Sequence, residues 1–323
     1  MTTIYYDTDA DVSRLEGSTI AVVGYGNQGR SWALNLRDSG ADVVACVRAD
    51  ETRQQAVADG FTPVDLEGAS RADVICLLVP DDVIPTLPIE PRADALVVVA
   101  SGYTPAFGRL DPNCDVGMVA PRMLGPEVRR CYEEGVGFIT AVGVHRDETG
   151  SALARTLAVA GAIGGLRQGA IEMTPLQEAV LDLAVEQALA PALQTVSRSF
   201  VEVMLEQGIP LEAILCELFL SGEVERNYRL LRLEGYGAQM EHHSPTSQYG
   251  QLSRVGHYAA MDPLSTMREI VENIRNGSFA DEWDAERDSG HPTLARLKGE
   301  ALPPEMLEWE RDLRRQLGEG VRH

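Results

Sequence analysis

Two carboxylates stand four residues apart in an otherwise apolar stretch, residues 178–189, which reads EAVLDLAVEQAL. Positions i and i+4 share one side of a helix, so Asp182 and Glu186 are expected to point the same way. Two like charges among leucine, valine and alanine are costly unless something compensates them. Carboxylate oxygens suit Mg²⁺ better than zinc. The pair therefore predicts a magnesium site, and the alternative is a narrow polar seam that faces solvent or a partner subunit.

A third carboxylate, Glu217, lies within EAILCELFL, where its neighbours are again apolar. A buried acid needs a cation or a hydrogen-bonding partner. Glu217 thus supports a metal ion or a polar substrate near these helices. An ion pair with one of the arginines in 226–232 is the alternative.

A glycine-rich loop, GYGNQG, follows directly after the apolar run TIAVVG at 19–24 and precedes a stretch with helical periodicity. Gly24, Gly26 and Gly29 have the spacing GxGxxG, which suits a tight turn, a close approach of the backbone to a pyrophosphate, and close packing of helix on strand. The loop is completed by Tyr25, Asn27 and Gln28. This context predicts a dinucleotide site, and the alternative is a tight turn in an α/β domain that has lost its cofactor.

The residues after the second strand run bear on the choice of nicotinamide cofactor. The sequence there is RADETR, residues 48–53. Arg48, Thr52 and Arg53 are suited to hold the 2′-phosphate of NADPH. Asp50 and Glu51 would instead bind a free 2′-hydroxyl. Arg48 at the strand end favours NADPH as the cofactor, and NADH is the alternative.

The order of apolar runs predicts an α/β domain followed by an all-α domain. Runs without polar alternation are typical of parallel strands covered on both faces. Strands are expected at 19–24, 42–47, 73–79, 94–100, 116–120 and 137–144. Helices are expected at 27–40, 175–207, 211–233, 262–276, 278–288 and 303–317. We therefore expect a Rossmann-type, doubly wound parallel sheet in residues 1–170 and a helical domain with the acidic site and a dimer interface in residues 171–323.

The composition narrows the classes of partner. Lys and Arg total 28 against 49 Asp and Glu, giving a net charge of -21, which disfavours nucleic acid and anionic membranes. No apolar run approaches the roughly 20 residues that span a bilayer. The five cysteines form no CxxC pair, and the N-terminus lacks an apolar signal segment. These features predict a soluble cytoplasmic protein that acts on a small molecule.

Several long stretches resemble ketol-acid reductoisomerases, the acetohydroxyacid isomeroreductases of branched-chain amino-acid synthesis. They are YYDTDADVSRLEGSTIAVVGYGNQGRSWALNLRDSGADV, VAPRMLGPEVRRCYEEGVG, IEMTPLQEAVLDLAVEQ and MREIVENIRNGSFADEW. The resemblance covers nearly the whole chain. It implies a Rossmann domain followed by a knotted all-α domain, in homodimers or higher homo-oligomers whose active sites are shared between subunits. It also implies a Mg²⁺-dependent alkyl shift in a 2-hydroxy-2-alkyl-3-oxo acid and reduction of the product by NADPH.

The resemblance assigns roles to individual residues. Asp182 and Glu186 match the first two metal-ligand carboxylates, and Glu217 matches a third that the other subunit provides. Ser244, in HHSPTSQYG, matches the serine that holds the substrate carboxylate. The fourth family acid falls on Ser221, and Glu223 takes its place only if the helix contains a bulge.

Two catalytic positions depart from the family pattern. Ser101, in ASG, stands where the family has a catalytic histidine, and Arg122, in APR, stands where it has a catalytic lysine. Arginine does not give up a proton near neutral pH. The alkyl shift needs metal ions and a base, so these changes predict an NAD(P)H-dependent reductase of a small keto acid or imine that does not isomerise its substrate. The alternatives are a genuine Mg²⁺-dependent ketol-acid reductoisomerase of valine and isoleucine biosynthesis, and a non-catalytic nucleotide-binding relative.

Overall fold

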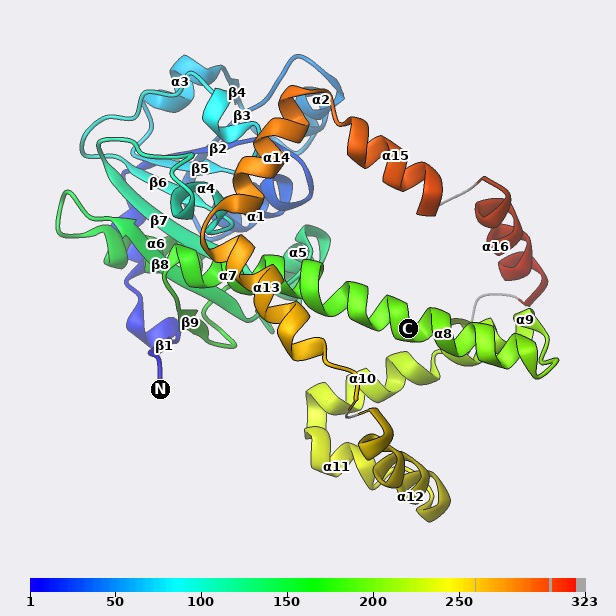
Figure 1. Cartoon of the computed structure of the whole chain (residues 1–323). Coiled ribbons are helices and arrows are strands. Elements are labelled where there is room, and N and C mark those ends of the chain that lie inside the picture. The colour runs from blue at the N-terminus through cyan, green and yellow to red at the C-terminus, as the bar shows by residue number, and fades with distance from the viewer. Residues whose placement is uncertain (259, 302–303, 318–323) are drawn as a thin grey trace. The chain divides into compact units, whose positions relative to one another are not determined.

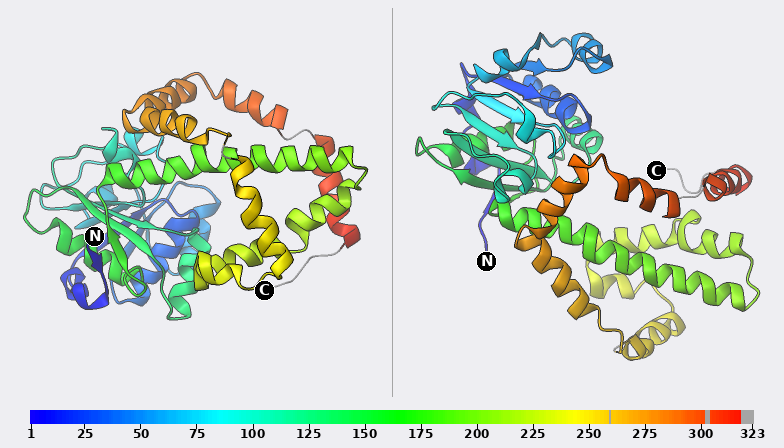
Figure 2. Two further views of the ribbon diagram at one scale, coloured as in Figure 1. Left: turned by 60° about the horizontal axis from the view of Figure 1, so that its bottom comes forward. Right: turned by 45° about the horizontal axis from the view of Figure 1, so that its top comes forward.

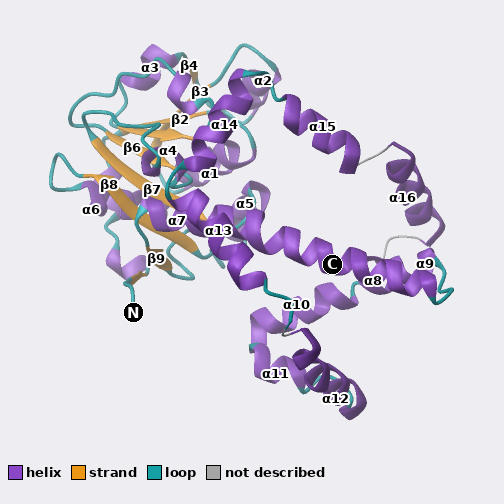
Figure 3. Ribbon diagram, in the orientation of Figure 1, coloured by secondary structure: helices purple, strands orange, loops and turns teal. Residues whose placement is uncertain are grey.

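The computed structural model describes residues 1–258, 260–301 and 304–317. The chain forms two compact units, Met1–Leu183 and Ala184–His323 (Figure 1). Strands occur in the first unit, whereas the described part of the second unit is helical (Figure 3). An α/β unit followed by a helical unit is the order that the sequence predicts.

The first unit contains a nine-stranded sheet with the order β1-β9-β8-β7-β6-β5-β2-β3-β4. Its strands are β1 (Ile4–Tyr5), β2 (Thr19–Val23), β3 (Asp42–Cys46), β4 (Pro63–Val64), β5 (Val74–Leu77), β6 (Leu96–Val99), β7 (Asp115–Pro121), β8 (Thr140–Arg146) and β9 (Ala170–Glu172). Strands β2 to β7 pair in parallel. Each of the six predicted strands is present, and β1, β4 and β9 are short additions of two or three residues.

The sheet is mixed rather than wholly parallel, which corrects one part of the predicted fold. Strand β8 runs antiparallel to β7, with Pro121 opposite Thr140, and β1 runs antiparallel to β9. A continuous apolar run indicates that a strand is buried but does not encode its direction. The parallel Rossmann-type core, β4 to β7, is as predicted. The antiparallel pairs lie at the end of the sheet formed by β7, β8, β9 and β1.

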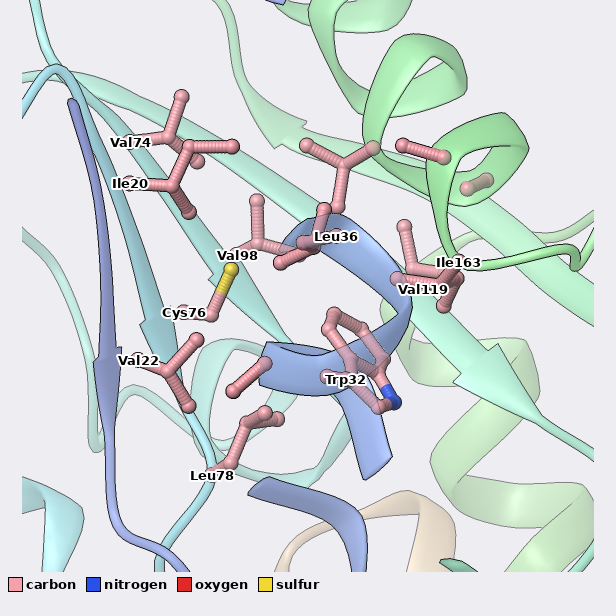
Figure 4. Close-up of a cluster of buried hydrophobic side chains, with 14 of the residues drawn as sticks. Ile20, Val22, Trp32, Leu36, Val74, Cys76, Leu78, Val98, Val119 and Ile163 are labelled. Carbon is pink, nitrogen blue, oxygen red and sulfur yellow. The ribbon is translucent and has the colours of Figure 1, made fainter. Parts of the chain in front are cut away.

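Helices cover both faces of this sheet. Successive residues of a strand point to opposite sides, and here the residues on both sides are apolar and must be buried. Ile20 and Val22 of β2 pack in one apolar cluster, whereas Ala21 and Val23 pack in the other. Figure 4 shows the first cluster around Trp32 of α1, whose side chain is fully buried. The helices of this unit are α1 (Asn27–Asp38), α2 (Glu51–Ala58), α3 (Leu66–Ser70), α4 (Tyr103–Ala106), α5 (Gly125–Glu133), α6 (Ala152–Ala162) and α7 (Pro175–Ala184).

The second unit consists of helices in its described residues, of which α8 is the longest (Figure 2). They are α8 (Ala190–Glu206), α9 (Leu211–Leu215), α10 (Glu223–Glu234), α11 (Tyr236–Met240), α12 (Pro245–Arg254), α13 (Pro263–Arg275), α14 (Ser278–Asp288), α15 (Pro292–Ala301) and α16 (Pro304–Leu317). Two π-helical segments, Val185–Leu189 and Cys216–Leu220, interrupt the long helices predicted at 175–207 and 211–233. The predicted domain boundary near residue 170 lies at the start of β9, and the two units divide between Leu183 and Ala184.

Candidate active site

The glycine loop joins β2 to α1 in the geometry that a dinucleotide site requires. Gly24 has φ +95°, and a Cβ there would lie 2.5 Å from the carbonyl oxygen of Leu78. A Cβ on Gly29 would lie 2.2 Å from the Gly24 carbonyl oxygen, so helix and turn touch at these two glycines. Gly26, by contrast, has nothing within 4 Å of its Cβ position and precedes the free N–H groups of α1. The open side of the loop therefore suits a pyrophosphate.

Two further loop residues, Tyr25 and Gln28, are engaged within the protein. The Tyr25 hydroxyl donates a hydrogen bond to Asp59 at 2.9 Å, and Arg30 donates to the same carboxylate at 2.7 Å. The Arg30 guanidinium lowers the pKa of Asp59 to about 2. The Gln28 amide donates to the backbone carbonyl of Met123 at 3.0 Å. These contacts hold the loop against Asp59 and Met123. The next loop residue, Asn27, is the first residue of α1.

The residues predicted to select the cofactor follow β3, the parallel neighbour of β2. The Arg48 side chain is 92% exposed and lies 3.3 Å from the Asp50 carboxylate. Asp50 caps α2, because its Oδ1 accepts hydrogen bonds from the Thr52 backbone N–H at 3.0 Å and from the Thr52 hydroxyl at 2.5 Å. Arg53 is exposed. Two exposed guanidinium groups therefore follow the strand next to β2, and Asp50 is occupied by its cap and by Arg48.

The loops after β5, β6 and β7 bring three polar side chains to the carboxyl edge of the sheet, where α/β proteins bind their ligands. They are Asp81, Ser101 and Arg122. The Ser101 hydroxyl donates a hydrogen bond to Oδ1 of Asp81 at 3.1 Å. Burial raises the pKa of Asp81 to about 6, and the charges of Glu178 and Asp182 act in the same direction. Asp81 is not identifiable as a site residue from the sequence, because an acid after Pro80 at a strand end is indistinguishable from an ordinary turn residue.

Arg122 binds two carboxylates of α7. Its Nη1 lies 2.5 Å from Oε1 of Glu178, and its Nη2 lies 2.8 Å from Oδ1 of Asp182. The other Glu178 oxygen accepts a hydrogen bond from the Gly102 backbone N–H at 2.6 Å. Glu178 is only 1% exposed, and this burial raises its pKa, while the Gly102 N–H and Arg122 oppose the rise.

Gly102 explains how the loop after β6 reaches α7. A Cβ on Gly102 would lie 2.0 Å from the carbonyl oxygen of Pro175, the first residue of that helix. The absence of a side chain thus allows the loop with Ser101 to rest on the first turn of α7. The arrangement joins the Ser101–Asp81 pair to the Arg122–Glu178–Asp182 cluster.

The surroundings of Asp182 and Glu186 are more exposed than their apolar sequence neighbours suggest. Leu181 and Val185, two of the apolar neighbours of these acids, are 49% and 48% exposed rather than buried. Asp182 is half-buried and Glu186 is exposed. Glu186 and the likewise exposed Glu217 each occupy the second position of a π-helical segment. Such segments are frequent at functional sites, and no residue pattern in the sequence indicates them.

The donor atoms fit a hard cation only in part. Carboxylate oxygens have the chemistry that Mg²⁺ prefers. However, one oxygen of Asp182 is held by Arg122. Across the residues that the structure describes in this single chain, no group of three His, Cys, Asp or Glu side chains is placed to hold a metal ion.

The remaining candidate residues, Ser244 and Glu223, lie in the second unit. Ser244 caps α12 and accepts a hydrogen bond from the Ser247 N–H at 3.3 Å. Glu223 begins α10, two residues after Ser221. Glu223, Ser221 and His243 line a hollow of about 760 Å³. A π-helical segment, Cys216–Leu220, ends just before Ser221, and the realignment of Glu223 stays a prediction.

Two family models match consecutive parts of the chain. The NADPH-binding domain of acetohydroxy acid isomeroreductases matches residues 14–169, and the C-terminal domain of ketol-acid reductoisomerases matches residues 176–319. The chain belongs to the ketol-acid reductoisomerase family. This membership confirms the resemblance seen in the sequence and makes the protein a member of a family of NAD(P)H-dependent oxidoreductases.

Curated relatives match over almost the full length. Ketol-acid reductoisomerase (NADP(+)) of Caldivirga maquilingensis is 39% identical, covering 99% of this chain and all of the relative. Ketol-acid reductoisomerase (NAD(P)(+)) of Metallosphaera sedula is 37% identical, covering 91% of this chain and 90% of the relative. A solved structure of an NADH-preferring ketol-acid reductoisomerase from an uncultured archaeon is 31% identical, with a TM-score of 0.88 and coverage of 97% and 98%.

These relatives bear on the three functional hypotheses. All are named as ketol-acid reductoisomerases, which favours the complete reaction over a reductase that has lost the alkyl shift. A non-catalytic role has no support among them. Within the described part of the chain, the helices are too short or too polar to span a membrane.

Proposed function

We propose that the protein catalyses the complete ketol-acid reductoisomerase reaction: an alkyl shift in a 2-hydroxy-2-alkyl-3-oxo acid, followed by reduction of the resulting 2-keto acid. The observation that carries this proposal is the match to both family domains, with identity up to 39% to full-length relatives of that name. The glycine loop and the α7 acids lie within the two matched ranges.

The cofactor we propose is NADPH. The open position at Gly26 and the N–H groups that begin α1 bind the pyrophosphate. Arg48 and Arg53, both exposed, contact the 2′-phosphate, with Thr52 beside them. The cap that occupies Asp50 supports this choice, since a capped acid is less available for a 2′-hydroxyl. When bound, the nicotinamide supplies the hydride, and Mg²⁺ supplies polarisation of the substrate oxygens.

The acidic site we propose is shared between two subunits. Asp182 and Glu186 hold Mg²⁺ from one subunit, Glu217 (with Glu223 as a further acid) contributes from the other, and Ser244 binds the substrate carboxylate. A homodimer is supported by a row of half-exposed apolar side chains along the helix that carries the acids, since an exposed apolar row of this kind marks an interface. Its members are Leu181, Val185, Leu189, Leu193, Val196, Phe200 and Val203.

Reduction without the alkyl shift is the second candidate, and one observation favours it. Arg122 is committed to Glu178 and Asp182, so a guanidinium without a removable proton occupies the position where the family has lysine. Ser101, at the histidine position, is likewise committed to Asp81. In this case the protein would reduce a keto acid or an imine.

Two substrates separate the candidates. Oxidation of NADPH would be followed with Mg²⁺ and either 2-acetolactate or the already isomerised 3-hydroxy-3-methyl-2-oxobutyrate. The complete reaction predicts turnover of both. Turnover of the isomerised acid alone would replace our proposal with the second candidate. Turnover of neither would overturn both for these acids and direct the search to imines.

A further inference from the structure

One guanidinium in the first unit forms ion pairs with two acids on successive turns of α7. Arg122 contacts Glu178 through Nη1 at 2.5 Å and Asp182 through Nη2 at 2.8 Å. The guanidinium has no ionisation near neutral pH, so its charge is permanent. It therefore compensates the charge of Asp182 as a bound cation would.

The two acids differ in their access to solvent. Glu178 is almost fully buried and has both oxygens hydrogen-bonded, to Arg122 and to the Gly102 N–H. The Asp182 side chain is 45% exposed, and only its Oδ1 contacts Arg122. Asp182 is thus the member of the pair that an incoming metal ion can reach.

Charge determines how strongly this pair attracts a divalent ion. Two ionised carboxylates carry two negative charges, and Arg122 returns one, so the cluster offers a single net negative charge. A positive charge a few ångströms from a divalent ion weakens its binding substantially, because the effective dielectric constant near a protein surface is far below that of water. As long as both carboxylates stay ionised, removing Arg122 doubles the net negative charge of the cluster, and replacing Glu178 with a neutral residue cancels it.

We propose that Arg122 is a resident cation of the acidic site: it holds Asp182 and lowers the affinity of the site for divalent metal. This inference rests on the proposed function in one respect, that Asp182 faces the metal. Arg122 acts through Asp182 and is a positioning residue. The site is then adjusted to bind metal weakly and together with substrate, whose own oxygens add the missing negative charge.

Direct metal binding tests this inference without turnover. Mn²⁺ would be titrated into the full chain, with free Mn²⁺ measured by electron paramagnetic resonance. Arg122→Gln is expected to bind Mn²⁺ at least about tenfold more tightly than the wild type, because one nearby positive charge is removed. Glu178→Gln is expected to bind about tenfold more weakly, because the Arg122 charge then falls on Asp182 alone.

A matched control is available on the opposite edge of the sheet. Arg92 also bridges two carboxylates, those of Asp73 and Asp94, at 2.9 and 3.0 Å. Arg92→Gln removes the same charge from a similar contact and should leave the Mn²⁺ affinity within about twofold of the wild-type value.

The two site variants protect the test against a folding failure. Arg122→Gln leaves Glu178 buried without its ion pair, whereas Glu178→Gln keeps an amide oxygen for the Gly102 N–H. Opposite shifts in the two variants support the inference. An unchanged affinity in a folded variant, or a shift in the other direction, overturns it while leaving the proposed function intact. A wild-type chain that binds no Mn²⁺ at millimolar concentration even when 2-acetolactate is present overturns both.

Discussion

Ser101 donates a hydrogen bond from its hydroxyl to Oδ1 of Asp81 across 3.1 Å, and this contact joins the loops that follow β5 and β6. Asp81 is also close enough to Glu178 and Asp182 for their charges to raise its pKa further, beyond the larger effect of burial. A neutral, protonated Asp81 is therefore favoured at mildly acidic pH. The pair lies at the carboxyl edge of the sheet, where the nicotinamide of a Rossmann domain is expected.

The raised pKa of Asp81 predicts a pH-dependent stability. Its folded pKa is about 6 against a usual 3.8, so the stabilisation from this group is complete below pH 3.8 and is lost as pH rises through about 6. Asp81→Asn keeps a hydrogen-bond acceptor for Ser101 and should gain about 1–3 kcal/mol at pH 7. Urea unfolding at several pH values measures this. Asp82→Asn is the control, and an unchanged pH slope in Asp81→Asn would contradict the account.

The two glycines of the cofactor loop should respond differently to alanine. Gly26→Ala places a methyl group in open space, so the protein should fold normally and lose at least about tenfold in NADPH affinity. Gly29→Ala forces a contact with the Gly24 carbonyl oxygen and should cost about 1–3 kcal/mol of stability. Thermal unfolding and nicotinamide fluorescence separate the two effects. Equal stability losses in both variants would argue against the loop geometry described above.

Glu178 is expected to stabilise the fold as well as to contribute its charge to the acidic site. Glu178→Ala leaves the Gly102 N–H and the Arg122 guanidinium without their acceptor and should cost about 2–4 kcal/mol. Glu178→Gln retains the acceptor for Gly102 and should cost clearly less. Unfolding in urea compares the two variants directly, and a larger loss in the glutamine variant would be inconsistent with this arrangement.

Arg48 should determine the preference for the phosphorylated cofactor. Its exposed guanidinium beside the glycine loop predicts that Arg48→Ser raises the KM for NADPH by about tenfold and changes the KM for NADH by less than about twofold. Arg71→Ser is a suitable control, because Arg71 is an exposed, ion-paired arginine that follows α3. Equal effects on the two cofactors would show that Arg48 does not read the 2′-phosphate.

Much of the first unit was predictable because its signals are local. Six apolar runs predict six strands, and the GxGxxG spacing predicts a loop whose close contacts the structure then displays at Gly24 and Gly29. The direction of β8 was not predictable, because its apolar run is the same in either orientation. The short strand β9 was also missed, since three residues leave no pattern.

The candidate site was predictable only where its members are close in sequence. Asp182 and Glu186 were identified from their spacing, but the π-helical segment that carries Glu186 leaves no mark in residue types. The ion pair between Arg122 and Glu178 joins positions 56 residues apart and depends on the packing of α7 against the sheet edge. The exposure of the apolar side chains beside the acids was not predictable, because periodicity does not distinguish a core face from an exposed apolar face.

The identity of the product tests the central proposal most directly. The protein would be incubated with 2-acetolactate, NADPH and Mg²⁺, and the product examined by proton nuclear magnetic resonance. The complete reaction predicts 2,3-dihydroxy-3-methylbutanoate, whose two methyl groups share one carbon and appear as singlets. Formation of 2,3-dihydroxy-2-methylbutanoate, whose second methyl is a doublet, would show reduction without migration and contradict the proposal.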